Sequence, residues 1–188
     1  MFVRATVLWQ CLDRPTLEFF QWTDDHEVAM RGEVVGDIGG IPGRVKYQVR
    51  TGSDWLTRVV RIQFRFDTGG RYLHLSRNLH GQWHVNGTKR PDLANVTDVD
   101  IGVTPATNTL PIRRFRLAVG ESRNLVAAWV QFPALSVTPA HQRYTRIAAD
   151  RYLYESLDSG YQAELTVQND GIVVQYANVW RVLTTVAL

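Results

Sequence analysis

Carboxylates and arginines gather in one stretch of the sequence. Residues 98–117 read DVDIGVTPATNTLPIRRFRL, so Asp98 and Asp100 precede a segment rich in Thr, Asn and Pro, and arginines follow it. Paired carboxylates beside an arginine are the groups that a hydrolase acting on a sugar or a phosphoester would use. Opposite charges on neighbouring strands also form ion pairs that stabilise a sheet and set its register. The stretch therefore has a catalytic and a structural interpretation.

The parity of the residues favours the structural interpretation. Alternation places Asp98 and Asp100 opposite the apolar residues of one expected strand, and Arg114 and Arg116 opposite those of a second strand after the loop. If the loop joins these strands as a hairpin, the carboxylates face the arginines. Arg113 falls on the apolar side instead. It either extends outward from the interior or presents its guanidinium to a phosphate or carboxylate on a bound amphiphile.

Other patterns that carry chemistry are weak. His74, His80 and His84 are closely spaced, but Gly81 predicts a turn among them and no cysteine or second acidic ligand accompanies them, so we expect no metal. There is no G-x-S-x-G nucleophile motif and no glycine-rich phosphate loop. Cys11 is the single cysteine, which excludes an internal disulfide. We therefore expect no catalytic residue and no cofactor.

The composition is that of an ordinary globular chain. At 188 residues, a single domain over 1–188 is expected. The N-terminus lacks the pattern of a signal peptide and the longest apolar run, 125–130, is too short to cross a bilayer, so we expect a cytoplasmic protein with no transmembrane segment. The net charge is +3, but the arginines are scattered among acidic residues, so no nucleic-acid partner is expected.

The dominant hydrophobic period is two. Strict alternation of apolar and polar residues runs through RVKYQVR (44–50), RVVRIQFRF (58–66) and YQAELTV (161–167), with Gly-containing turns between such segments. No window forms a convincing amphipathic helix. These patterns predict an all-β, mainly antiparallel fold: one large curled sheet that forms an open roll or incomplete barrel, with little helix.

Two segments add detail to this prediction. Residues 124–132, NLVAAWVQF, are apolar on both faces, so a helix or second sheet covers the far side of this strand, or that side lines an apolar cavity. Residues 73–85 and 163–176 each read strand, Gly-containing turn, strand, which is consistent with an internal duplication of a β-meander and equally with ordinary hairpins.

Several motifs together resemble a known family. DVDIGVTPATNTLPIRRF, AAWVQFPAL, QRYTR, YLYES, AELTV and NDGIVVQY are similar to the bacterial family described as putative glycolipid-binding. The resemblance implies a single-domain antiparallel sheet with an apolar cleft, like that of lipoprotein carriers, and implies no catalytic residues. It places a ligand-binding site at the residues that match its distinctive segment, and two aromatic residues suited to a wide groove complete the expected set: Asp98, Asp100, Thr104, Asn108, Arg113, Arg114, Trp129 and Tyr144.

Three hypotheses for function follow. The first is a non-enzymatic binding protein that shelters the acyl chains of an amphiphile, such as a glycolipid, against Val60, Ile62 and Phe64 or against Val126, Ala128 and Val130, with Arg113 near the head group. The second is a hydrolase-type enzyme that uses Asp98, Asp100 and Arg113. The third is a structural module whose basic outer face meets another protein.

Overall fold

The protein is a single, very long β-sheet. The computed structural model describes residues 3–24 and 28–187. Its strands are β1 (Val3–Cys11), β2 (Thr16–Asp24), β3 (Val28–Asp37), β4 (Pro42–Thr51), β5 (Thr57–Phe66), β6 (Gly69–Arg77), β7 (Trp83–Val85), β8 (Thr88–Lys89), β9 (Asp98–Ile101), β10 (Ser122–Gln131), β11 (Ser136–Arg146), β12 (Arg151–Ser156), β13 (Gln162–Val167), β14 (Val173–Tyr176) and β15 (Trp180–Ala187). Two 3₁₀ turns, η1 (Pro91–Leu93) and η2 (Ala106–Asn108), and one helix, α1 (Thr109–Phe115), complete the described elements.

All 15 strands belong to one sheet, in the order β8-β7-β6-β5-β4-β3-β2-β1-β15-β14-β13-β12-β11-β10-β9. Every described pairing is antiparallel except that of β9 with β10, which is parallel. The predicted class, an open and mainly antiparallel sheet with little helix, is confirmed. The sheet is neither closed nor strongly curled.

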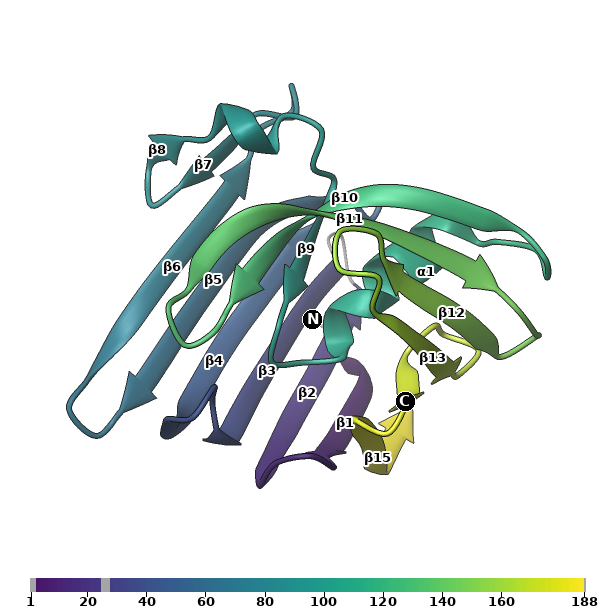
Figure 1. Cartoon of the computed structure of the whole chain (residues 1–188), viewed down its shortest axis with the longest axis horizontal. Helices are drawn as coiled ribbons and strands as arrows, with labels where there is room; N and C mark the ends of the chain where they lie inside the picture. The colour runs from purple at the N-terminus through teal and green to yellow at the C-terminus, as the bar shows by residue number, and fades with distance from the viewer. Residues whose placement is uncertain (1–2, 25–27, 188) are drawn as a thin grey trace.

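The strand order divides the sheet into two parts at β15. The part formed by β9–β14 lies across the part formed by β1–β8. In Figure 1, β10 and β11 pass over the face of the strands β3–β5. Two hydrogen bonds join β5 to the edge strand β9 and to the residue before it: the backbone N–H of Val99 donates to Thr57 Oγ1 (3.2 Å), and that of Thr57 donates to the carbonyl of Thr97 (3.2 Å). Two parts of one sheet thus form the two layers of the molecule.

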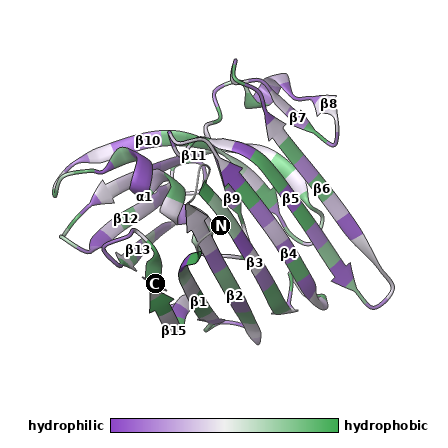
Figure 2. Ribbon diagram, turned by 180° about the vertical axis from the view of Figure 1, so that it is seen from behind, coloured by the Kyte–Doolittle hydropathy of each residue, from purple (hydrophilic) through white to green (hydrophobic). Residues whose placement is uncertain are grey.

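The predicted alternation decides which side chains enter the space between the layers. In β4 and β5 every second residue is buried, and Figure 2 shows hydrophobic and hydrophilic residues alternating along these strands. The main core contains Val45, Val49, Val60, Ile62 and Phe64 from this layer, and Ala128 and Val130 of β10 from the other layer. Because these side chains contact one another and are almost wholly inaccessible to solvent, the faces expected to line an acyl-chain groove form a packed core, and that expectation is wrong.

The apolar second face of β10 is covered as well. Leu125 and Ala127 pack in a second cluster with Ile112 of α1, Tyr144 of β11 and Leu165 of β13. A helix and neighbouring strands therefore bury this face, which is one of the alternatives that the sequence left open. The same face continues to Trp129, whose side chain remains 41% exposed.

The helix α1 is a departure from the sequence prediction. Residues 113–119 were expected to form a strand that pairs with 98–103 as a hairpin, but 109–115 are helical and β9 pairs with β10 instead. Thr109, Leu110, Pro111 and Ile112 are all buried, so the first turn of this short helix has no polar side that could produce an amphipathic pattern. Pro111 is tolerated because it lies in the first turn, where a backbone N–H has no acceptor within the helix.

The packing of Ile62 gives a test of the filled core. Its side chain is wholly buried, so Ile62→Ala removes apolar contacts and leaves a cavity. The free energy of unfolding, measured by urea denaturation, is expected to fall by about 2–5 kcal/mol. A loss below about 1 kcal/mol would instead indicate that Ile62 faces an open groove. Tyr72→Ala on β6, which removes a side chain that is 56% exposed, is the control and should change stability little.

Candidate ligand-binding cleft

A cleft of about 600 Å³ opens beside the second apolar cluster. Strands β9–β12 and β14 and the turn before α1 surround it, together with the first residue of β15. Its size is within the usual range for sites that hold a drug-sized ligand. Its lining residues are Asp100, Ile101, Gly102, Thr104, Pro105, Asn108, Trp129, Thr138, Pro139, Ala140, Gln142, Tyr154, Ser156, Asp158, Ser159, Tyr161, Tyr176, Val179 and Trp180.

Aromatic rings form one wall of the cleft. Tyr154 of β12 is the centre of this group, with ring centroids 6.3 Å from Tyr161 and 6.2 Å from Tyr176. Behind it, Tyr144 packs edge-on against Tyr154 at 5.4 Å. Burial is the largest cause that raises the pKa of Tyr154 and of Tyr176, and the Asp100 carboxylate raises both further. Both phenols are therefore neutral, so this wall offers ring faces and hydroxyl groups but no charge.

A second part of the cleft lining consists of fixed polar groups, and we call it the polar wall. The Nε2 of Gln142, a buried residue of β11, donates to Asp100 Oδ2 at 2.7 Å. The hydroxyl of Tyr144 donates to Asn108 Oδ1 at 2.7 Å, and Asn108 Nδ2 donates to the carbonyl of Pro105 at 2.9 Å. These bonds fix the orientation of both amides. The polar wall is consequently held in place before any ligand arrives.

The charge in the cleft is negative. Asp100 and Asp158 line it, whereas no lysine, arginine or histidine does so in the part of the chain that the structure describes. Burial raises the pKa of Asp100 to about 6, and the hydrogen bond from Gln142 opposes part of this rise. Backbone and side-chain hydrogen bonds from His141 lower the pKa of Asp158. Near neutral pH both carboxyl groups are ionised, so the cleft disfavours anions.

A buried acid supports the floor of the cleft. Thr104 Oγ1 donates to Glu18 Oε1 at 2.8 Å, and the hydroxyl of Tyr47 donates to the same oxygen. Gly32, opposite Tyr47 on β3, leaves room for the ring, since a Cβ there would lie 2.2 Å from Tyr47 Cε1. Burial raises the pKa of Glu18 to about 8, against the effect of both hydrogen bonds. Glu18 is therefore mostly protonated at neutral pH.

Asp98 has a different environment from Asp100. It is buried, and its Oδ2 accepts hydrogen bonds from Thr97 Oγ1 (2.6 Å) and from Arg114 Nη2 of α1. Asp98 does not line the cleft; it borders, with Asp100, an adjoining cavity of only about 10 Å³. The expected contact between these carboxylates and the arginines thus exists for Asp98 and Arg114, although the arginine comes from a helix rather than from a paired strand. Asp100 bonds to Gln142 instead.

The expected site residues therefore separate into two groups. The structure places Asp100, Thr104, Asn108 and Trp129 on the cleft, and Tyr144 directly behind it through its bond to Asn108. Asp98 and Arg114 form the buried ion pair beside it. The Arg113 guanidinium lies over the rings of Trp22 and Trp55, 5.1 and 4.9 Å from their centroids, so it lies away from the cleft. Asp98, Asp100 and Arg113 thus do not form one constellation.

Sequence reasoning missed several lining residues. Gln142 belongs to QRYTR, one of the motifs that carry the family resemblance, but it was not assigned to the site because a single glutamine within an alternating strand is common. Tyr154, Tyr161 and Tyr176 lie in different segments of the sequence, and only the pairing of β12, β13 and β14 brings them together. In the described chain no group of three or more His, Cys, Asp or Glu could hold a metal ion. No helix among those residues is long and apolar enough to span a membrane.

The fold and the cleft define an all-β protein with a site of the size of a small ligand. This site is lined by neutral aromatic rings and by acidic groups. Residues 6–182 match the family model described as "Putative glycolipid-binding", and the chain belongs to this family. A crystal structure of a DUF1089 family protein from Pseudomonas aeruginosa is similar to it, with a TM-score of 0.79 and 32% sequence identity over 88% of this chain and 91% of that chain. A search of curated proteins gives no match.

The Asp98–Arg114 pair gives a prediction about stability. Arg114→Gln leaves a buried carboxylate without its cation, so the free energy of unfolding in urea at neutral pH should fall by about 3–5 kcal/mol. Arg116→Gln, which removes the same charge from an exposed position on the same segment, should change it by less than about 0.5 kcal/mol. Equal effects of the two substitutions would show that the ion pair contributes nothing specific.

Glu18 gives a prediction about pH. Its pKa is raised in the folded protein, so its contribution to stability is present below its ordinary pKa of 4.5 and is lost as pH rises toward about 8. Glu18→Gln keeps an acceptor for Thr104 and Tyr47 but cannot ionise. The difference in unfolding free energy between variant and wild type should therefore shift in favour of the variant from about pH 5 to pH 8 and then remain constant. A difference that is independent of pH would contradict the raised pKa.

Proposed function

We propose that the protein binds an amphiphile with an uncharged, hydroxyl-rich head group, with a glycolipid as the ligand class, and that the sugar lies in the cleft between the tyrosines and Asp100. The proposal is supported by the family to which the chain belongs and by one observation above all. The cleft combines aromatic rings with fixed carboxylate and amide groups, and among the described residues it has no cation. This combination complements a sugar, which has apolar ring faces and hydroxyl edges.

The polar wall would recognise the head group through hydrogen bonds. An ionised Asp100 accepts hydrogen bonds from hydroxyl groups, and such charge-assisted bonds are stronger than neutral ones. Ser156 and Ser159, which also line the cleft, add hydroxyl groups that donate or accept. A phosphate, sulfate or free carboxylate would instead meet the negative field of Asp100 and Asp158. The head group is therefore neutral in this proposal, and Arg113 has no part in binding it.

The aromatic wall would contribute most of the binding free energy. Trp129 and Tyr161 are partly exposed at 41% and 45%, so a ligand that covers them removes apolar surface from water. Each buried methylene of an attached chain adds about 0.8 kcal/mol. Because the core between the two layers is filled, the cleft of about 600 Å³ holds the head group and the first part of a chain, rather than two complete acyl chains.

Matched detergents test this proposal. Octyl glucoside and octyl sulfate share a chain and differ in the head group, so calorimetric titration should show binding of the first and at least about tenfold weaker binding of the second. Affinity for octyl glucoside should fall as pH drops through about 6, since protonated Asp100 is a weaker acceptor. Equal binding of both detergents, or binding that is independent of Asp100, would contradict the proposal.

Asp100→Asn is the variant that examines the head-group contact. It removes the charged acceptor and should weaken octyl glucoside binding by about tenfold and abolish the pH dependence. Glu164→Gln, which removes one negative charge from an exposed ion pair with Arg151, is the matched control and should bind like the wild type. Thermal unfolding of both variants establishes that the fold is retained. Native mass spectrometry of gently purified protein would then identify a retained lipid.

A further inference from the structure

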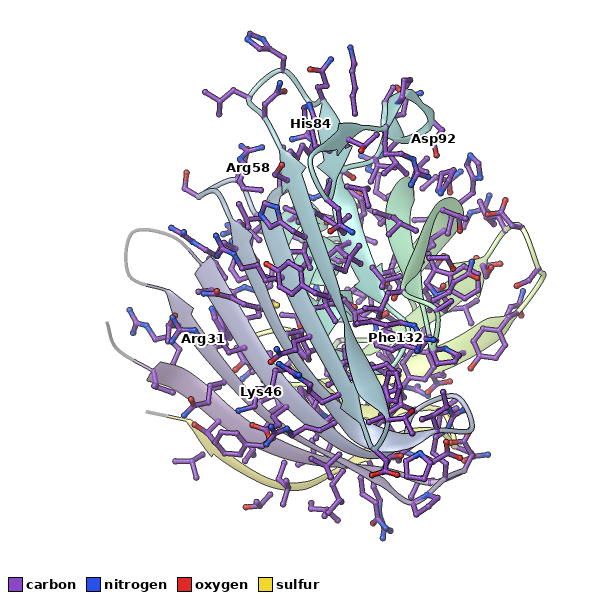
Figure 3. The ribbon with its side chains drawn as sticks, turned by 90° about the vertical axis from the view of Figure 1, so that its left-hand side faces the viewer. Arg31, Lys46, Arg58, His84, Asp92 and Phe132 are labelled. Atoms are coloured by element: carbon purple, nitrogen blue, oxygen red, sulfur yellow. The ribbon has the colours of Figure 1, made fainter. Side chains whose placement is uncertain are left out.

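The outer face of the N-terminal layer is strongly basic. On strands β3–β5, the side chains that point away from the main core include Arg31, Arg44, Lys46, Arg61 and Arg65, which we call the basic face. Figure 3 shows Arg31 and Lys46 on this outer side of the sheet. Two acidic residues of β3 among those described share this alternation. Glu33 pairs with Arg44 (3.4 Å) and Lys46 (3.2 Å), whereas Asp37, at the end of the strand, accepts a hydrogen bond from the backbone N–H of Gly40 in the following turn.

The arrangement of the basic face leaves positive charge uncompensated. Arg44 and Arg65 are direct cross-strand neighbours in the register of β4 and β5, and like charges in such positions are destabilising. Arg31, Arg61 and Arg65 are exposed, and no acidic residue occupies a directly opposite position in the described register. Since Glu33 already pairs with two of the cations and Asp37 bonds to the turn after β3, this face has the electrostatic character of a surface for a polyanion.

Apolar side chains border the basic face. Leu17 and Phe19 of β2 and Val35 of β3, which we call the apolar strip, are 45%, 48% and 51% exposed. Leu17 lies opposite Val35, and Val35 lies opposite Arg44, so the apolar strip and the basic face are continuous. A nucleic-acid backbone would gain little from aliphatic side chains, whereas a bilayer surface accepts apolar groups beneath its head groups and basic groups among its phosphates.

We propose that the basic face and the apolar strip together dock the protein on the surface of an anionic lipid bilayer. The basic residues lie against anionic head groups, and Leu17, Phe19 and Val35 enter the interface between head groups and acyl chains. This surface is on the outer side of β2–β5, whereas the cleft is formed by β9–β12 and β14. The docking surface is therefore separate from the ligand site and does not depend on its proposed ligand.

Sedimentation with vesicles tests the docking surface. The wild-type protein should bind vesicles of phosphatidylcholine with phosphatidylglycerol, bind vesicles of phosphatidylcholine alone much more weakly, and lose affinity as salt is added. The double variant Arg61→Gln/Arg65→Gln should bind the anionic vesicles about ten- to thirtyfold more weakly. Lys89→Gln/Arg123→Gln removes the same charge from exposed positions on β8 and β10 and should remain within about twofold of the wild type.

A second variant examines the apolar strip. Leu17→Ser/Phe19→Ser keeps every charge but should remove the part of vesicle binding that persists at high salt. Octyl glucoside binding, measured on all these variants, should stay at the wild-type level, so a failure of this proposal is distinguishable from a failure of the proposed ligand. Three results would overturn the docking surface: no binding to anionic vesicles, equal loss in both charge variants, or tighter binding of an oligonucleotide than of vesicles through the same arginines.

Discussion

The contact between the two layers is the interaction on which the rest of the structure depends. A single sheet has two faces, and this chain has too little helix to cover either of them. It therefore buries its apolar side by laying one part of the sheet across the other, with Ile62 and Phe64 in one layer and Ala128 and Val130 in the other. The hydrogen bonds between β9 and β5 hold the edge strand in this position.

Buried acids are a second consequence of this arrangement. Layers that meet face to face enclose some polar side chains, and each one needs a compensation of its own. Asp98 is compensated by Arg114, Glu18 by protonation and two hydroxyl donors, and Asp100 by Gln142 and partial contact with solvent. Only Asp100 is both ionised near neutral pH and open to a ligand. Of these three carboxyl groups, Asp100 thus has the fewest stabilising partners, and it is the one that supplies a charged acceptor to the site.

Local patterns in the sequence predicted the strands well and their assembly poorly. The alternation in β4, β5 and β13 is strict because each has one buried and one wetter face, and such strands can be recognised from period alone. α1 was missed because its first residues are buried on all sides, which erases the helical period. The parallel pairing of β9 with β10 depends on a segment of about twenty residues between them, and no property of either strand encodes its direction.

The same distinction applies to the site. Thr104 and Asn108 were identified because they belong to a distinctive segment, whereas Gln142 and the tyrosines reach the cleft only through the pairing of β11–β14. Arg113 was placed in the expected site because it belongs to that segment, and its parity with apolar residues left open a contact with a ligand. In the structure Arg113 lies on a helix, and its guanidinium makes cation–π contacts with Trp22 and Trp55.

The neighbour relation between β1 and β15 has a consequence for how the molecule is assembled. β1, the first of the 15 strands in chain order, lies in the interior of the sheet, where β2 occupies one side of it and β15 the other. Until β15 has been synthesised, one edge of β1 lacks its partner, and no backbone hydrogen bonds between β1 and β15 join the two halves of the sheet. Contacts of such wide sequence separation slow folding and expose strand edges to other chains. Completion of the native sheet consequently requires β15, and a chain that lacks it presents an unpaired strand edge that can pair with other chains.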